Sequence, residues 1–213
     1  MENQEAIMQR WQKLRKGNQC NMNYHNITKD DMLNGSGLRV VLWLSGCNHY
    51  CKGCQNPQTW DCNDGIKFDI SAKNEIFEQL NTNHISGITF SGGDPLHKNN
   101  VEEVYNLCNE IRRKYPNKTI WLYTGSTWEE IICKAGIICS SNISEDDYIW
   151  KKRKEILELT DVIVDGEYKE ELKDVNYPWA GSTNQRVIDT KKSLLKGEVE
   201  LWKQEVLVKT NTN

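Results

Sequence analysis

Short runs that are apolar on both faces alternate along this 213-residue chain with segments of helical periodicity. Strands buried on both faces are typical of parallel sheets that helices cover. The alternation therefore predicts an α/β domain with a mostly parallel sheet and right-handed crossovers. The expected strands cover residues 38–44, 87–90, 119–123, 161–165 and 186–189, and the expected helices cover residues 71–80, 101–115, 126–133 and 150–159.

Capping residues mark the starts of three expected helices. Ser71 precedes one apolar periodic segment, and Asn100 precedes another with Glu103 in the position of a capping-box carboxylate. Ser126 and Glu129 have the spacing of a capping box at the start of a third helix.

The expected strands and helices define one domain with additions at both ends. We expect residues 23–189 to form this domain, with an irregular polar insertion at residues 134–149. Residues 1–22, with a helical pattern at 4–15, are expected to form an N-terminal extension, and residues 190–213 a C-terminal tail.

The charge and hydropathy of the chain argue against two classes of partner. The 27 Lys and Arg against 30 Asp and Glu give a net charge of −3, which provides no overall field that would attract nucleic acid. No apolar run approaches the length of about 18 residues that a membrane span needs, and the N-terminus has no apolar signal segment. We therefore expect a cytoplasmic protein that binds neither nucleic acid nor a membrane.

Cysteine is the unusual part of the composition, with eight residues in a chain expected to stay in a reducing compartment. Three of them, Cys47, Cys51 and Cys54, follow the first buried strand with the spacing C-x3-C-x2-C. The other five are scattered, and we interpret each as a packing or incidental residue: Cys20, Cys62, Cys108, Cys133 and Cys139.

Three thiolates within eight residues can hold one soft metal centre. A [4Fe–4S] cluster usually takes four Cys, so three would leave one iron open to a substrate or cofactor. A structural zinc site completed by Cys62 or His49 and a simple packing role remain as alternatives.

Four unusual segments each follow an expected buried strand: the Cys cluster and residues 91–94, 123–125 and 165–166. Ligands of such sheets bind outside the carboxyl ends of the strands, so we expect these segments to meet at one end of the sheet. The glycines within residues 91–94 would expose backbone to a ligand, with polar groups placed to receive an amine, although an ordinary turn has the same composition. The same two interpretations apply to residues 165–166.

The Cys cluster followed by Gly92-Gly93-Asp94-Pro95 resembles the radical S-adenosylmethionine (AdoMet) superfamily. Within it, the chain resembles the family that activates anaerobic (class III) ribonucleoside-triphosphate reductases. The segments that carry the likeness are 23–25, 34–39, 43–60, 91–97, 120–125, 164–166 and 179–185.

This resemblance implies a partial (β/α) barrel and reductive cleavage of AdoMet to methionine and a 5′-deoxyadenosyl radical. The radical would remove a hydrogen atom from a glycine of the large reductase subunit. The implied cofactors are a [4Fe–4S] cluster and AdoMet, and the implied partners are that large subunit and an external electron donor such as flavodoxin.

The resemblance also implies residue roles. Cys47, Cys51 and Cys54 would hold three irons, and AdoMet would chelate the fourth through its amino and carboxylate groups. The residues implied at the AdoMet site are Gly53, Cys54, Gln55, Ser91, Gly92, Gly93, Asp94 and, more weakly, Lys169. Gly53 and Gln55 depart from the aromatic residues that many superfamily members carry beside the third Cys, so the resemblance assigns no adenine contacts.

Two other functions stay open at this point. A radical AdoMet enzyme that acts on a small molecule, similar to 7-carboxy-7-deazaguanine synthase, would carry the same Cys cluster. A non-catalytic zinc-binding module would bind zinc in place of iron and sulfide.

Overall fold

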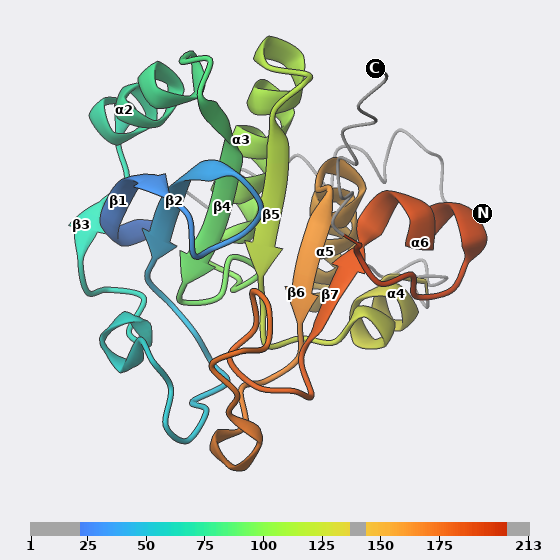
Figure 1. Ribbon diagram of the computed structural model, residues 1–213. Coiled ribbons are helices and arrows are strands. Elements are labelled where there is room, and N and C mark those ends of the chain that lie inside the picture. Colours follow the sequence, from blue (N-terminus) through green and yellow to red (C-terminus); the bar gives the residue numbers. More distant parts are fainter. Residues whose placement is uncertain (1–21, 137–143, 204–213) are drawn as a thin grey trace, which may run out of the picture.

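One seven-stranded sheet runs through the residues that the computed structural model describes, which are 22–136 and 144–203 (Figure 1). Its spatial order is β3-β1-β2-β4-β5-β6-β7. The strands are β1 (Asn23–Asp31), β2 (Leu38–Leu44), β3 (Ile66–Lys67), β4 (Ile85–Gly92), β5 (Thr119–Tyr123), β6 (Val162–Asp165) and β7 (Arg186–Asp189). The helices are α2 (Ile70–Leu80), α3 (Val101–Lys114), α4 (Trp128–Gly136), α5 (Glu145–Leu159) and α6 (Thr190–Lys196), with short 3-10 turns at Pro57–Thr59 and Glu170–Leu172.

The central strands confirm the predicted class and the mostly parallel sheet. β2, β4, β5 and β6 are parallel neighbours, while β1 and β3 on one side and β7 on the other pair antiparallel. The sheet is open, with β3 and β7 at its two edges, so the expected barrel is not confirmed. The antiparallel strands end the parallel series on each side instead of continuing it around an axis.

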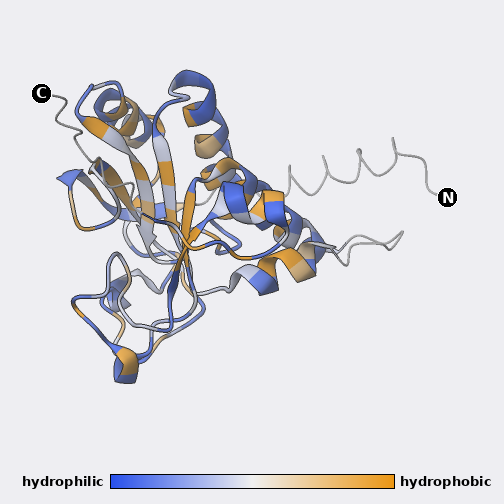
Figure 2. Ribbon diagram, turned by 45° about the vertical axis from the view of Figure 1, so that its right-hand side comes forward, coloured by the Kyte–Doolittle hydropathy of each residue, from blue (hydrophilic) through white to orange (hydrophobic). Residues whose placement is uncertain are grey.

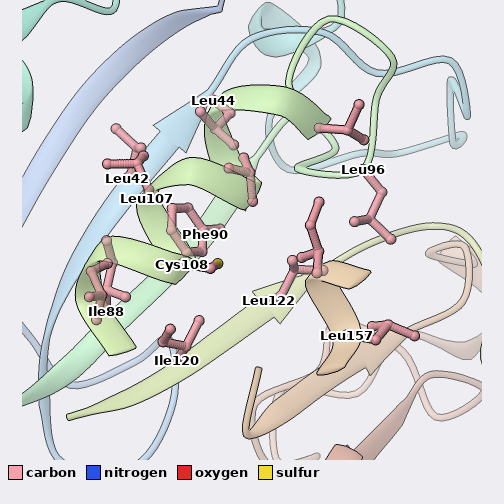
Figure 3. Packing of buried hydrophobic residues seen from close by; sticks show 14 of the residues in the cluster. Leu42, Leu44, Ile88, Phe90, Leu96, Leu107, Cys108, Ile120, Leu122 and Leu157 are labelled. Atoms are coloured by element: carbon pink, nitrogen blue, oxygen red, sulfur yellow. The ribbon is translucent and has the colours of Figure 1, made fainter. Parts of the chain in front are cut away.

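One face of the sheet carries the main apolar core. Leu42, Phe90 and Leu122 lie side by side on three neighbouring strands and are fully buried. Helices α3 and α5 cover this face with Leu107, Cys108 and Leu157, as Figure 3 shows. The helices in Figure 2 are striped by hydrophilic and hydrophobic residues, as expected for helices with one buried face. Cys108 therefore has the packing role that its position predicts.

The opposite face of the same strands carries large polar and aromatic side chains. Arg39 is fully buried there, and its guanidinium donates to Thr89, to Thr119 and to backbone carbonyls. Burial lowers the pKa of Arg39 to about 9. Trp121 lies on this face against Trp179 and Trp202, with ring centroids 5.6 and 5.1 Å away.

The expected helix caps are shifted by one or two residues. The Asp69 carboxylate, not Ser71, accepts hydrogen bonds at the start of α2, because its oxygen reaches the backbone N–H groups of Ser71 and Ala72. At α4 the Thr127 hydroxyl accepts from Glu130 N–H, in place of the expected Ser126–Glu129 box.

Asn100 precedes α3 as predicted but does not cap it with its side chain. Its amide donates to the carbonyls of Ser45, at 2.8 Å, and Asp94, at 2.9 Å. Asn100 thus holds two strand-end loops together, which is a tertiary role that helix periodicity does not reveal.

Residues at the expected insertion and tail are partly helical. α4 continues to Gly136, and α5 starts at Glu145 with a capping box between Ser144 and Asp147, so α5 begins five residues before the expected position. Residues 190–196 form α6, and Leu201 bridges to Ile188.

Several expectations fall on residues that lie outside the described ranges. These are residues 1–21 of the N-terminal extension with the helix at 4–15, residues 137–143 of the insertion, residues 204–213 of the tail, Cys20 and Cys139. Within the described ranges, no helix has both the length and the apolar character needed to cross a membrane.

Candidate cluster and cofactor site

The loop after β2 carries the three clustered cysteines (the Cys loop, residues 45–54). Backbone hydrogen bonds fix where it starts, since Gly46 N–H donates to Thr59 and Cys47 N–H to Trp60. Cys54 N–H donates to the Cys51 carbonyl at 3.1 Å, which closes a turn between these two cysteines. In Figure 1 this cyan loop and the orange segment after β6 lie at the same end of the sheet, below β2, β4 and β5.

All three thiols are free and half-buried. Burial raises the pKa of the Cys47 thiol to about 12 and also raises the pKa of Cys51. Metal binding requires thiolates, so ligation must displace protons from these groups.

The three cysteines line a single cavity of about 680 Å³. Loops after all four parallel strands contribute to it, as the positions of the strand ends predict. Its walls include Cys47, His49, Cys51, Cys54, Gln55, Ser91, Gly92, Gly93, Asp94, Tyr123, Thr124, Gly125, Gly166, Tyr168, Trp179 and Gln185.

This arrangement fits a [4Fe–4S] cluster. Across the described residues, no three His, Cys, Asp or Glu side chains are arranged to hold one metal ion. A cluster does not need such convergence, because each Cys binds a different iron. Three soft, half-buried thiols around one open cavity leave room for a further ligand on the remaining iron.

The two glycines at the end of β4, Gly92 and Gly93, allow two strand ends to pack against each other. A Cβ at Gly93 would lie 2.7 Å from the Gly46 carbonyl oxygen, and one at Gly92 would lie 2.9 Å from Leu44 N. Gly92 also has a φ of +93°, which favours glycine. The Gly93 and Asp94 N–H groups donate to Leu44 and Gly46. Close approach of backbone to backbone is therefore the first reason for the glycine pair, which also lines the cavity.

Asp94 is a buried carboxylate at the centre of a hydrogen-bond network. Its Oδ1 accepts from Leu96 N–H at 2.8 Å, and its Oδ2 lies 2.9 Å from His49 Nε2 and 3.0 Å from Thr124 Oγ1. Burial is the largest single effect and opposes ionisation of Asp94, but the hydrogen bond and charge of His49, the Leu96 N–H and the charge of Arg153 together outweigh it and lower the pKa of Asp94. The same hydrogen bond raises the pKa of His49 to about 9, against the effect of burial.

Of the residues weighed as a fourth protein ligand, His49 is hydrogen-bonded on both ring nitrogens and Cys62 does not line this cavity. Both ring nitrogens of His49 face carboxylates, because Nδ1 lies 3.0 Å from Glu167 Oε1. Cys62 lines a separate cavity of about 570 Å³ with Tyr50, Trp60 and His97.

Most of the residues implied at the AdoMet site come together, and two do not. Cys54, Gln55 and residues 91–94 line the cavity, whereas Gly53 and Lys169 are not among its lining residues. Gly53 faces the Glu170 side chain, and the Lys169 N–H donates to Ser182 Oγ. The roles of all these residues in binding stay predictions.

Asp165 and Gly166, interpreted from the sequence as either a ligand contact or an ordinary turn, have different surroundings in the structure. The Asp165 carboxylate accepts from Trp128 N–H at the start of α4 and from Arg186 Nε, which is a structural role. Gly166 lines the cavity.

Two wall segments of the cavity, residues 31–34 and 175–181, were not predicted from the sequence to line it. Met32, Leu33 and Val175 are 71%, 83% and 84% exposed although they are apolar. Exposed apolar residues in polar loops are the only local sign of a binding surface in these segments. The segments are far in sequence from the Cys loop, so the sign does not connect them with the cavity.

Comparison with known proteins agrees with this geometry. Residues 33–188 match the family model described as a 4Fe-4S single cluster domain. The chain is 38% identical over 166 residues to the anaerobic ribonucleoside-triphosphate reductase-activating protein of Enterobacteria phage T4, covering 78% of this chain and 93% of that protein. Proteins of the same name from Escherichia coli K12 and Haemophilus influenzae are 38% and 35% identical, over 78% and 77% of this chain and 97% and 96% of their own lengths.

Proposed function

We propose that this chain, which belongs to the family of anaerobic ribonucleoside-triphosphate reductase-activating proteins, activates such a reductase by generating a glycyl radical on its large subunit. The observation that carries the proposal is the single cavity that brings Cys47, Cys51 and Cys54 together with the glycine turn after β4. Three protein thiols at that cavity leave one iron of a [4Fe–4S] cluster for AdoMet.

When bound, the cluster and AdoMet would supply the redox chemistry, which is one-electron reductive cleavage of the sulfonium to methionine and a 5′-deoxyadenosyl radical. The protein's part is to hold, orient and shield the reacting groups. Cys47, Cys51 and Cys54 would fix three corners of the cluster at the end of β2. Ser91 and Asp94 would bind the polar groups of AdoMet from the end of β4, and Gln55 lies beside the third cysteine.

A primary carbon radical must meet its target within about van der Waals contact, so the substrate glycine has to enter the same cavity. The exposed residues Met32, Leu33 and Val175 are among those that line the cavity. A protein loop from the reductase suits this opening, and an external electron donor such as flavodoxin would reduce the cluster.

The test is anaerobic reconstitution with iron and sulfide, reduction, and addition of AdoMet and an anaerobic ribonucleoside-triphosphate reductase. We expect a glycyl radical on the reductase by electron paramagnetic resonance. Cys51→Ala should abolish AdoMet cleavage and the glycyl radical, because one iron loses its only protein thiolate. Cys133→Ala is the matched control, since Cys133 is an exposed free thiol on α4 that does not line the cavity. A Cys51→Ala variant that cleaves AdoMet normally would contradict the proposal.

A further inference from the structure

His49 connects the Cys loop with loops that follow three of the parallel strands. Its Nε2 lies 2.9 Å from Oδ2 of Asp94, after β4, and its Nδ1 lies 3.0 Å from Oε1 of Glu167, after β6. The loop after β5 packs against the ring, because a Cβ added at Gly125 would lie 2.5 Å from His49 Cδ2, which leaves no room for a side chain. One side chain thus contacts every other loop that follows a parallel strand.

The Asp94 carboxylate uses three of its hydrogen-bond acceptor sites within the described residues. A carboxylate offers about four lone-pair sites. Leu96 N–H uses one on Oδ1, and His49 and Thr124 use two on Oδ2. Hydrogen bonds among the described residues (22–136 and 144–203) therefore leave one acceptor site, on Oδ1, and His49 helps to fix the direction of that site.

We infer that His49 is a positioning residue that sets the orientation of Asp94 and so the affinity of the cavity for the amino group of AdoMet. The inference rests on the function proposed above. His49 is two residues from both Cys47 and Cys51. A cluster that fixes these cysteines also fixes His49, so loading the cluster prepares the cofactor cavity.

The experiment uses the full chain with His49→Gln, and His84→Gln as the matched control. His84 also pairs with a carboxylate, Asp30 at 3.0 Å, but its side chain is 56% exposed and does not line the cavity. Three quantities are measured: iron and sulfide content after reconstitution, AdoMet affinity by equilibrium dialysis, and amide hydrogen exchange of residues 123–127 and 165–169 before reconstitution.

We expect His49→Gln to bind as much iron and sulfide as the unmodified chain. Its AdoMet affinity should fall about tenfold or more, because a charge-assisted hydrogen bond to Asp94 is lost. Amide exchange in both loops should be faster, because their link to the Cys loop is gone. His84→Gln should match the unmodified chain in all three measurements.

Normal AdoMet affinity and normal exchange in His49→Gln would overturn the inference and leave the proposed function intact. Failure of the unmodified, cluster-loaded chain to bind AdoMet would instead overturn the proposed function. If His49→Gln does not assemble the cluster, Glu167→Ala decides, because that side chain is 55% exposed and its removal takes away the partner of Nδ1 that helps to hold the His49 ring against Asp94. That variant should lose AdoMet affinity by about three- to tenfold, and unchanged affinity would contradict the inference.

Discussion

Gly93→Ala tests the close packing of the two strand ends that build the site. The new Cβ would lie 2.7 Å from the Gly46 carbonyl oxygen and 3.0 Å from the Leu44 carbonyl oxygen. Both atoms belong to backbone that is hydrogen-bonded to residues 93 and 94, so neither can rotate away as a side chain could. Overpacking of this kind costs about 1–3 kcal/mol. We expect the free energy of unfolding to fall by about 2 kcal/mol, which a domain with about 5–15 kcal/mol of stability survives.

The assay is equilibrium urea unfolding of the full chain, followed by tryptophan fluorescence and circular dichroism. Gly136→Ala is the matched control, because a Cβ at that position, the last residue of α4, meets nothing within 4 Å. Ala is a better helix former than Gly by up to about 1 kcal/mol, so this control should be as stable as the unmodified chain or more stable. Equal stability of the two variants would refute the packing argument.

Two further changes test other parts of the fold. Trp202→Ala removes two edge-to-face ring contacts, with Trp121 at 5.1 Å and Trp179 at 5.0 Å, and should lower the free energy of unfolding by about 2 kcal/mol in the same urea assay; no change would contradict the role of this cluster. Burial opposes ionisation of Asp161, but hydrogen bonds with Lys191 and Arg112 lower its pKa in the folded chain. The ionised carboxylate therefore stabilises the fold fully above its unfolded pKa of about 3.9, and this stabilisation is lost as the pH falls through the lower, folded pKa. Asp161→Asn should therefore lose less stability on acidification, measured by urea unfolding at a series of pH values. An unchanged decrease of the free energy of unfolding at low pH would show that other groups cause the acid sensitivity.

The parallel strands could be predicted because both of their faces are buried. Short apolar runs mark β2, β4, β5 and β6, as is typical of strands buried on both faces. Because these strands are parallel, the Cys loop and the turn at residues 91–94 lie at the same end of the sheet. The cavity that joins these segments confirms that argument.

The edge elements could not be predicted in the same way. β1 is only partly buried and polar along much of its length, so neither an apolar run nor an alternating pattern marks it. The first turn of α5 is acidic, which is typical of a helix N-terminus but also of a polar loop, and this hid its start at Glu145.

The hydrogen-bond network of the site depends on tertiary contacts. His49 and Glu167 are 118 residues apart, and no local pattern pairs them. The glycine turn was expected to expose backbone to a ligand, but its Cβ positions are occupied first by the backbone of residues 43–46. Motif spacing thus predicted where the candidate site lies, while the packing of the structure explains the individual residues.

The function proposed for the cavity is tested most directly by the hyperfine coupling between the reduced cluster and isotopically labelled AdoMet, measured by electron–nuclear double resonance on the anaerobically reconstituted chain. We expect coupling to the labelled amino nitrogen and carboxylate oxygen, because the iron without a protein thiolate would bind both groups. An intact cluster that shows no such coupling, or a chain that takes up zinc in place of iron and sulfide, would contradict it.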